Sequence, residues 1–281
     1  MSRSFVYKPV QFFLYSLLIT SICHLFAAYV SFYQSMGHLL FPLILVGMSG
    51  PSIAALTILF QANNKNLLDD FYQRLYLSRI KIHFIPIVLL CMPCLVLSAI
   101  AISLLFGQSI DQFLSLDRAP DQSLQGINII GMLIILFMAC SLEEIGWRGY
   151  GIDSLHIIFN LWHTSLIFAC IWSLWHVPAF FIQHGYFQQE VLSLGWLAVA
   201  IYFLSLFPVT VVMNWVYIKN NRSILIVILF HMVMNLSYGL FHMQLVTKMI
   251  LMILLFIVAG IIVLRDKKLF FKSSKNLPIK S

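Results

Sequence analysis

Charged residues are scarce in this chain. Asp and Glu contribute only 10 of its 281 residues, Lys and Arg contribute 17, and together they make up 10% of the sequence. Water-soluble domains carry about 25% charged residues, so this composition excludes an ordinary soluble protein. With 61% hydrophobic residues and a mean hydropathy of +0.93, the chain is predicted to be an integral membrane protein.

Cysteines and paired metal-binding motifs are sparse as well. The five cysteines are scattered through apolar stretches, which excludes a disulfide framework. Cys91 and Cys94 have the C-x-x-C spacing without a second pair, so we interpret them as packing residues. The sequence has no H-E-x-x-H zinc motif. Its net charge of +7 does not indicate nucleic-acid binding, because the basic residues collect in short loops and in the tail.

What the chain does contain is a series of long apolar runs. A membrane-spanning helix needs about 20 predominantly apolar residues. The runs that meet this requirement are 10–33, 39–60, 84–107, 127–159, 163–183, 191–217, 223–242 and 246–264. We therefore predict an all-α, polytopic membrane bundle of about eight transmembrane helices, which forms a single domain over residues 1–281.

The positions of the basic residues predict the orientation of this bundle. If the helices alternate in direction, one side receives Arg3, Lys8, Lys65, Arg74, Arg79, Lys81, Lys219, Arg222 and the basic tail 265–281. The other side receives Arg118 and Lys248 together with the acids Asp111, Asp117, Asp121 and Glu190. The positive-inside rule then predicts that both termini are cytoplasmic, and we expect the protein in a bacterial cell membrane. Membrane lipid is an expected partner, with the tail lying on anionic headgroups.

Two adjacent acids, Glu143 and Glu144, lie inside one predicted span and are followed by Arg148. Carboxylates at membrane depth are costly and rare, so this pair is the strongest functional signal in the chain. Glu144 and Arg148 share one helix face, which predicts an ion pair that fixes packing. Glu143 is rotated by about 100° from Glu144 and lacks that partner. We predict that Glu143 acts as a base on water; a purely structural role is the alternative.

Trp172 and His176 share a face of the following span. A lone membrane histidine is more often a packing residue than a catalyst. Its position favours function, because the chain is expected to reverse near Asn160, 17 residues after Glu143 and 16 before His176, with Thr164 capping the next helix. In an antiparallel helix pair the carboxylate and the imidazole would lie at the same depth and could hold one water between them.

His231 and Asn235 form a third pair with the same spacing of four. Nine residues, or about 13 Å of helix, separate His231 from Arg222, which places His231 well inside the membrane. Two unrelated buried polar residues are the alternative. Three polar helix faces in so apolar a chain favour one shared site, and residues 127–242 form the motif-bearing core.

The three motifs together resemble those of a known family. Glu-Glu-x-x-x-Arg at 143–148, Trp-x-x-x-His at 172–176 and His-x-x-x-Asn at 231–235 look like the motifs of the CAAX protease and bacteriocin-processing family of intramembrane endopeptidases, also called the CPBP or Abi family. The second motif of that family usually begins with Phe, and Trp172 keeps an aromatic side chain there. The resemblance implies an eight-helix bundle with a polar intramembrane cavity that opens to the cytoplasm.

By motif position, the resemblance also implies roles for the site residues. Glu143 would be the general base on a water, with His176 assisting. His231 and Asn235 would polarise the carbonyl group and bind the oxyanion. Three further motif residues would have supporting roles: Glu144, Arg148 and Trp172.

The cofactor and the function leave alternatives open. Glu143, His176 and His231 could ligate zinc, but a metal-free glutamate mechanism fits the same residues and is preferred. A proton-coupled transporter would also use buried Glu and His side chains, although the sequence shows no inverted repeat. A non-catalytic immunity factor that binds a bacteriocin is a third reading. The expected substrate is a peptide or protein, prenylated or bacteriocin-like, and nucleic acid is not an expected partner.

Overall fold

The computed structural model describes residues 7–113 and 129–272. The sequence-based expectations for Arg3, Asp117, Arg118, Asp121, Lys275 and Lys280 concern residues outside these ranges. All regular structure in the described residues is helical, so the predicted all-α membrane bundle is confirmed.

The longer helices follow the predicted apolar runs closely. They are α1 (Pro9–Val30), α2 (Gly37–Met48), α3 (Gly50–Gln61), α5 (Ile85–Leu104), α6 (Ile129–Gly146), α8 (Leu161–His176), α10 (Trp196–Lys219), α11 (Ile224–Gly239) and α12 (Leu245–Arg265). Shorter helices lie between them: α4 (Lys65–Gln73), α7 (Ile152–His156), α9 (Tyr186–Leu194) and α13 (Lys267–Phe271). A π-helix, Trp147–Gly151, joins α6 to α7, and a 3₁₀-helix, Val177–Phe181, follows α8.

Six helical segments in the described part of the chain are long and apolar enough to cross a membrane, and a bent pair formed by α2 and α3 makes a seventh candidate. The remaining predicted run corresponds to α11, which is apolar but shorter. The predicted span 39–60 is therefore broken, with a bend of 49° around Ser49. Pro51 lies in the first turn of α3, where its fixed φ angle is compatible with a new helix start.

Two glycines allow the first helices to pack closely against the catalytic region. A Cβ atom on Gly50 would lie 2.4 Å from Thr20 Oγ1 of α1, and one on Gly146 would lie 2.4 Å from the Pro51 carbonyl oxygen of α3. Both distances are well inside van der Waals contact, so α1, α3 and α6 approach each other only because side chains are missing at these points. The end of α6, just after the two glutamates, is thereby held against α3.

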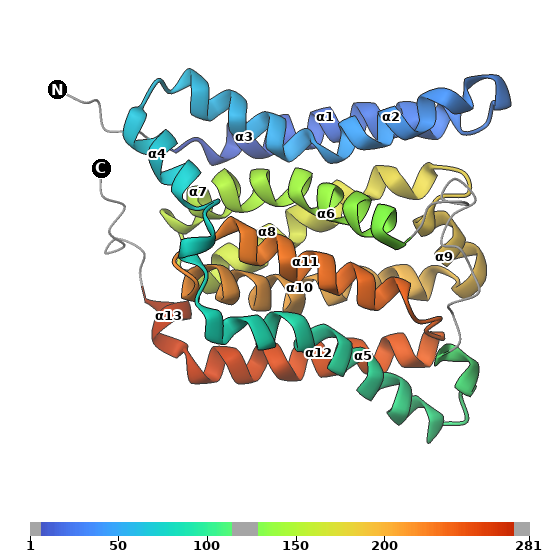
Figure 1. Ribbon diagram of the computed structural model, residues 1–281. Helices are drawn as coiled ribbons and strands as arrows, with labels where there is room; N and C mark the ends of the chain where they lie inside the picture. The colour runs from blue at the N-terminus through green and yellow to red at the C-terminus, as the bar shows by residue number, and fades with distance from the viewer. Residues whose placement is uncertain (1–6, 114–128, 273–281) are drawn as a thin grey trace.

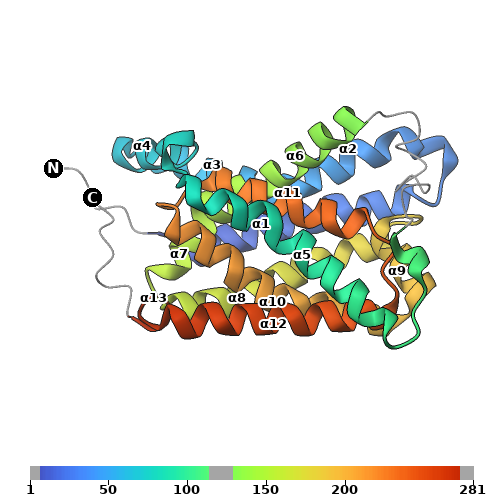
Figure 2. The same cartoon turned by 60° about the horizontal axis from the view of Figure 1, so that its bottom comes forward.

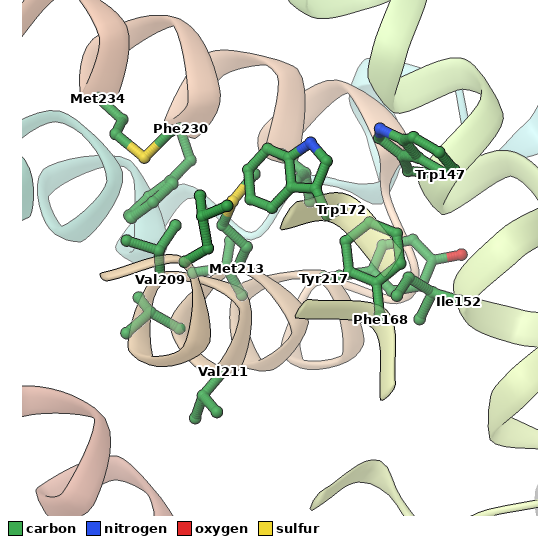
Figure 3. Close-up of a cluster of buried hydrophobic side chains, with 14 of the residues drawn as sticks. Trp147, Ile152, Phe168, Trp172, Val209, Val211, Met213, Tyr217, Phe230 and Met234 are labelled. Atoms are coloured by element: carbon green, nitrogen blue, oxygen red, sulfur yellow. The ribbon is translucent and has the colours of Figure 1, made fainter. Parts of the chain in front are cut away.

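The motif-bearing helices occupy the middle of the bundle (Figure 1). Helices α1, α2 and α3 pack together on one side and contact α6, while α5 and α12 pack against α11 and α10 on the other. Large buried side chains from α8, α10 and α11 fill the space between them (Figure 3), including Trp172, Met213 and Phe230. This packing fixes three helices, α6, α8 and α11, around one interior.

The start of α1 and helix α13 lie at one end of the bundle and α9 lies at the other, as Figures 1 and 2 show from two directions. The reversal predicted near Asn160 is present, but the cap of α8 is Asn160 itself. Its side chain accepts a hydrogen bond from the His163 backbone N–H at 2.9 Å, while the Thr164 hydroxyl is buried inside the first turn. The prediction that Thr164 caps this helix was therefore wrong, because Asn160, four residues earlier, already satisfies a free N–H group of the first turn.

Candidate active site

Glu143 lies near the end of α6, just before the π-helix, and its side chain is buried. Its Oε2 atom accepts a hydrogen bond of 3.2 Å from the indole Nε1 of Trp172. Within the described ranges no ion pair involves this carboxylate. Glu143 is therefore buried without the arginine partner that Glu144 has, as predicted, and the hydrogen bond from the Trp172 indole is a contact that was not predicted.

Glu144 and Arg148 form the predicted ion pair. Arg148 Nη1 lies 2.7 and 2.9 Å from the two carboxylate oxygens of Glu144, and both side chains are completely buried. The guanidinium also lies 5.2 Å from the Phe168 ring centroid and contacts Asn214 Oδ1 at 3.4 Å. A buried charge is tolerated when it is paired and hydrogen-bonded in this way.

His231 adds a contact that the sequence spacing did not reveal. Its Nδ1 atom lies 2.9 Å from Glu144 Oε1, so α11 is joined to α6 through a carboxylate–imidazole pair. Glu144 is ionised opposite Arg148 and can only accept, which assigns the proton to His231 Nδ1. Glu144 therefore has two effects. It balances the charge of Arg148, and it orients the His231 imidazole, because a hydrogen bond at one ring nitrogen determines whether the other nitrogen donates or accepts.

His176 has a defined tautomer for a similar reason. Its Nδ1 atom lies 2.6 Å from the backbone carbonyl oxygen of Trp172. A carbonyl oxygen has no proton to donate, so Nδ1 carries the hydrogen and Nε2 keeps a free lone pair. The imidazole is buried, and its ring packs 5.5 Å from that of Tyr202. His176 is therefore poised to accept a proton or to orient a water through Nε2.

A cavity of about 430 Å³ brings the candidate catalytic residues together. Glu143, His176, His231 and Asn235 all line it, as does Trp172. Glu144 and Arg148 do not line this cavity; they are bonded to each other, and Glu144 also contacts His231.

Asn235 lies one helical turn beyond His231, facing the same cavity. Its amide Nδ2 atom lies 3.6 Å from Cys140 Sγ, a weak contact that leaves the amide available to a ligand. His24 also lines the cavity, although its place in the sequence suggested only a position near a helix end. Its Nε2 atom lies 3.3 Å from the Ile44 carbonyl oxygen, which accounts for this histidine as a packing residue.

The cavity extends from Glu143 toward the end of the bundle that carries α9. Gly185 and Tyr186, at the start of α9, and Gly239, at the end of α11, belong to its lining. This end lies opposite the start of α1 and opposite α13 in Figures 1 and 2. With the termini in the cytoplasm, as the charge distribution predicts, this end of the cavity would face the other side of the membrane.

The possible zinc ligands are not arranged as a metal site. Within 7–113 and 129–272, no three His, Cys, Asp or Glu side chains are close enough to one another to hold a metal ion. Structural and catalytic zinc sites need at least three protein ligands directed at one point. The trio Glu143, His176 and His231 does not fit this requirement.

The contacts that support the end of the glutamate helix were not predicted from the sequence. Trp147–Gly151 forms a π-helix, whose widened turn leaves backbone carbonyl groups without their usual partners. Arg74, in the connection after α4, donates to the carbonyl oxygens of Arg148 at 3.0 Å and Gly149 at 2.9 Å. The Tyr217 hydroxyl also donates to the Arg148 oxygen, at 2.8 Å.

Asp153 belongs to this supporting cluster as well. Its carboxylate lies 2.6 Å from Arg74 Nη1 and 2.5 Å from Arg222 Nη2. Asp153 is thus paired with two arginines, and His156 Nδ1 contacts the Phe159 carbonyl oxygen at 3.1 Å, so neither side chain belongs to the cavity lining. Burial disfavours a charged Arg74, but the Tyr217 phenol and the Asp153 carboxylate outweigh it and raise its pKa, so this buried guanidinium stays charged.

A helical membrane bundle with an acid, two imidazoles and an amide around one interior cavity is the architecture of an intramembrane hydrolase. Comparison with known proteins identifies the family. The family model of Rce1-like type II CAAX prenyl endopeptidases matches residues 125–237. The chain is also 35% identical to CAAX prenyl protease 2 of Methanococcus maripaludis over 274 residues, which cover 97% of this chain and 99% of that protein.

The chain therefore belongs to the CAAX prenyl protease family of intramembrane endopeptidases, and the resemblance seen in its three motifs is confirmed. It is an integral membrane peptidase whose substrate is a peptide or protein within the membrane. The family match covers all three motifs, from Glu143 to Asn235. The transporter reading is not supported by these relatives.

Proposed function

We propose that this protein is a metal-free endopeptidase in which Glu143 activates the attacking water. The observation that carries the proposal is the buried Glu143 carboxylate, which faces the cavity beside His176 and has no cation bonded to it. Such a carboxylate can accept a proton from water, whereas Glu144 is held by Arg148. His176 Nε2 would orient the same water through its lone pair.

The reaction can be written with every proton accounted for. Glu143 takes one proton as the water oxygen bonds to the carbonyl carbon, which generates a negatively charged oxygen. The protonated Glu143 then gives its proton to the departing amine as the C–N bond breaks. His231, protonated on both nitrogens against Glu144, and the Asn235 amide are the donors proposed to stabilise the oxyanion. Before the reaction, with Glu143 ionised, the charges of Glu143, Glu144, Arg148 and His231 sum to zero. In the intermediate the oxyanion carries the negative charge that Glu143 has lost.

The proposed substrate is a C-terminal CAAX-type segment, in which a prenylated cysteine is the fourth residue from the end. The names of the matching family and of the archaeal relative support this substrate class. The cavity supports it too, because Ile44, Met48, Leu206 and Val209 provide an apolar wall for a lipid group. The alternative substrate is a bacteriocin-like peptide, which carries no prenyl group.

Cleavage by purified protein tests this proposal. We expect release of the three residues after the cysteine from a farnesylated peptide, and at least a tenfold lower kcat/KM for the same peptide without the farnesyl group. Mass spectrometry of the products gives the cleaved bond. Equal cleavage of both peptides would contradict recognition of the lipid, and cleavage of neither by wild-type protein would contradict the endopeptidase proposal for this substrate class.

Activity is expected to survive removal of metal ions. The candidate ligands do not converge on a single point, and Glu144 could leave Arg148 only by exposing a buried charge. The measurement is peptide cleavage after exhaustive chelation, together with the zinc content of the purified protein. The control is the same protein taken through the same procedure without chelator. Loss of activity that zinc restores and magnesium does not would decide for a metallopeptidase.

We propose from the charge distribution that both termini are cytoplasmic, so that the α9 end of the cavity lies toward the opposite side. Reporter fusions at Ser281 and at Asp111 are expected to report opposite sides, with Ser281 inside. A Ser281 reporter on the outside would reverse this orientation and would place the α9 end in the cytoplasm. The same side for both reporters would contradict the alternating helix order.

A further inference from the structure

A second, smaller cavity adjoins the active-site cavity at the α9 end of the bundle. The two share part of their lining: Tyr186, Phe187, Tyr202, Ser205 and Tyr238. A continuous row of aromatic rings runs from the catalytic residues to the smaller cavity. The distances between ring centroids are 5.5 Å from His176 to Tyr202, 5.1 Å from Tyr202 to Phe187 and 5.4 Å from Phe187 to Tyr186. The smaller cavity has a volume of only about 30 Å³, room for about one water molecule, so a substrate group can enter it only by displacing a side chain that now lines it.

The smaller cavity contains a cation that the proposed reaction does not use. Lys248, near the start of α12, lines it and pairs with Glu190 of α9. The Lys248 side chain is 12% exposed and the Glu190 side chain is 25% exposed, so the pair is shielded but accessible. Among the described residues that line either cavity, Lys248 is the one Lys or Arg.

The distance between the catalytic residues and this cation matches a short peptide. Tyr238 lines both cavities and lies seven residues after His231 on α11, which corresponds to about 10 Å of helix. Three residues in an extended conformation also span about 10 Å. If the scissile carbonyl group lies at His231, the end of a three-residue extension lies beside Tyr238 and Lys248.

We propose that Lys248 binds the C-terminal carboxylate of the substrate, and that this carboxylate replaces Glu190 as the partner of the ammonium group. This inference rests on the proposed function, because a CAAX-type segment ends three residues after its cysteine. The hydroxyl groups of Tyr186 and Tyr238, which line the same cavity, can donate further hydrogen bonds to the carboxylate. Lys248 thereby determines that cleavage occurs at a fixed distance from a free chain end.

A simpler role for the pair would be to hold α9 against α12. The two roles predict different results for two substitutions. Lys248→Met removes the cation but keeps an apolar side chain of similar length, and Glu190→Gln breaks the ion pair while leaving Lys248 in place. If the pair only holds the helices together, both variants should behave alike. If Lys248 binds substrate, only Lys248→Met should lose recognition of the carboxylate.

The experiment compares a farnesylated peptide that has a free C-terminal carboxylate with the same peptide as a C-terminal amide. We expect wild-type protein to prefer the free acid by about 10- to 100-fold in kcat/KM, mainly through KM, because a hydrogen bond to a charged group is lost in the amide. In Lys248→Met the preference should fall to about onefold through loss of activity on the acid alone. In Glu190→Gln the preference should persist.

Binding of both peptides to the Glu143→Gln variant separates this inference from the proposed reaction, since it requires no turnover. Tighter binding of the acid, abolished by adding Lys248→Met, supports the carboxylate site even if the catalytic role of Glu143 is wrong. Equal binding of acid and amide to a protein that retains Lys248 would overturn the inference. Equal losses in Lys248→Met and Glu190→Gln on both peptides would also overturn it, in favour of a purely structural ion pair.

Discussion

Replacement of Glu143 by glutamine is expected to lower kcat for peptide cleavage by about 10²- to 10⁴-fold while the protein remains folded. The amide cannot take a proton from water, so the proposed activation step is lost. Folding should be preserved because glutamine has nearly the same volume and its carbonyl oxygen can still accept the hydrogen bond from Trp172 Nε1. The measurement is single-turnover cleavage together with the thermal unfolding midpoint in detergent.

The matched control for this variant is Asp69→Asn, which also removes one negative charge but does so at an exposed position on α4. That control should retain wild-type activity. Activity of Glu143→Gln equal to that of wild-type protein would show that Glu143 is not the base. Loss of activity accompanied by a large fall in the unfolding midpoint would assign Glu143 a structural role instead.

Replacement of Glu144 by glutamine is expected to destabilise the protein by about 3–5 kcal/mol, because it leaves the completely buried Arg148 without its counter-charge. The loss should appear as a lower yield and a lower unfolding midpoint. Activity of the remaining folded protein should fall too, since His231 loses the carboxylate that stabilises its protonated form. This dual effect distinguishes Glu144 from Glu143, whose substitution should affect activity alone.

The two effects of Glu144 can be separated with a second substitution. Adding Arg148→Met to Glu144→Gln removes the uncompensated charge and replaces the ion pair by groups that a buried site tolerates well. We expect the unfolding midpoint to recover toward the wild-type value, whereas activity should stay low because His231 remains without its anionic partner. An unfolding midpoint for Glu144→Gln equal to that of wild-type protein would contradict the assignment of this ion pair as a stabilising contact.

The sequence predicted the helices well because membrane insertion imposes a simple requirement on it. A helix that crosses a bilayer must be long and apolar, and few other segments meet that condition. Apolar composition continues through the break at Ser49, so the length rule joins α2 and α3 into one span, and only the local Gly and Pro residues indicate the bend. Helix α9 was not recognised as a separate helix, because its sequence merges with the start of the next apolar run.

Contacts within one helix were predictable, and contacts between helices were only partly so. The Glu144–Arg148 pair follows from the spacing of four residues. The shared turn near Asn160 correctly indicated that α6 and α8 bring Glu143 and His176 to one cavity. The Glu144–His231 contact joins residues 87 positions apart, and a periodic pattern gives the face of each helix without giving its rotation relative to another helix.

Arg74 has a consequence for how the protein is made. Arg74 is synthesised well before the later helices that it contacts. The acid already present nearby is Asp70, one helical turn earlier, and the two side chains lie 3.1 Å apart in the complete structure. Asp153, the π-helix carbonyl groups and Tyr217 emerge from the ribosome only later. The π-helix after the glutamates therefore has its full set of contacts only when Arg74, from the N-terminal third of the chain, and Tyr217, from α10, both reach it. A single guanidinium group thus ties the connection after α4 to the geometry of the glutamate helix.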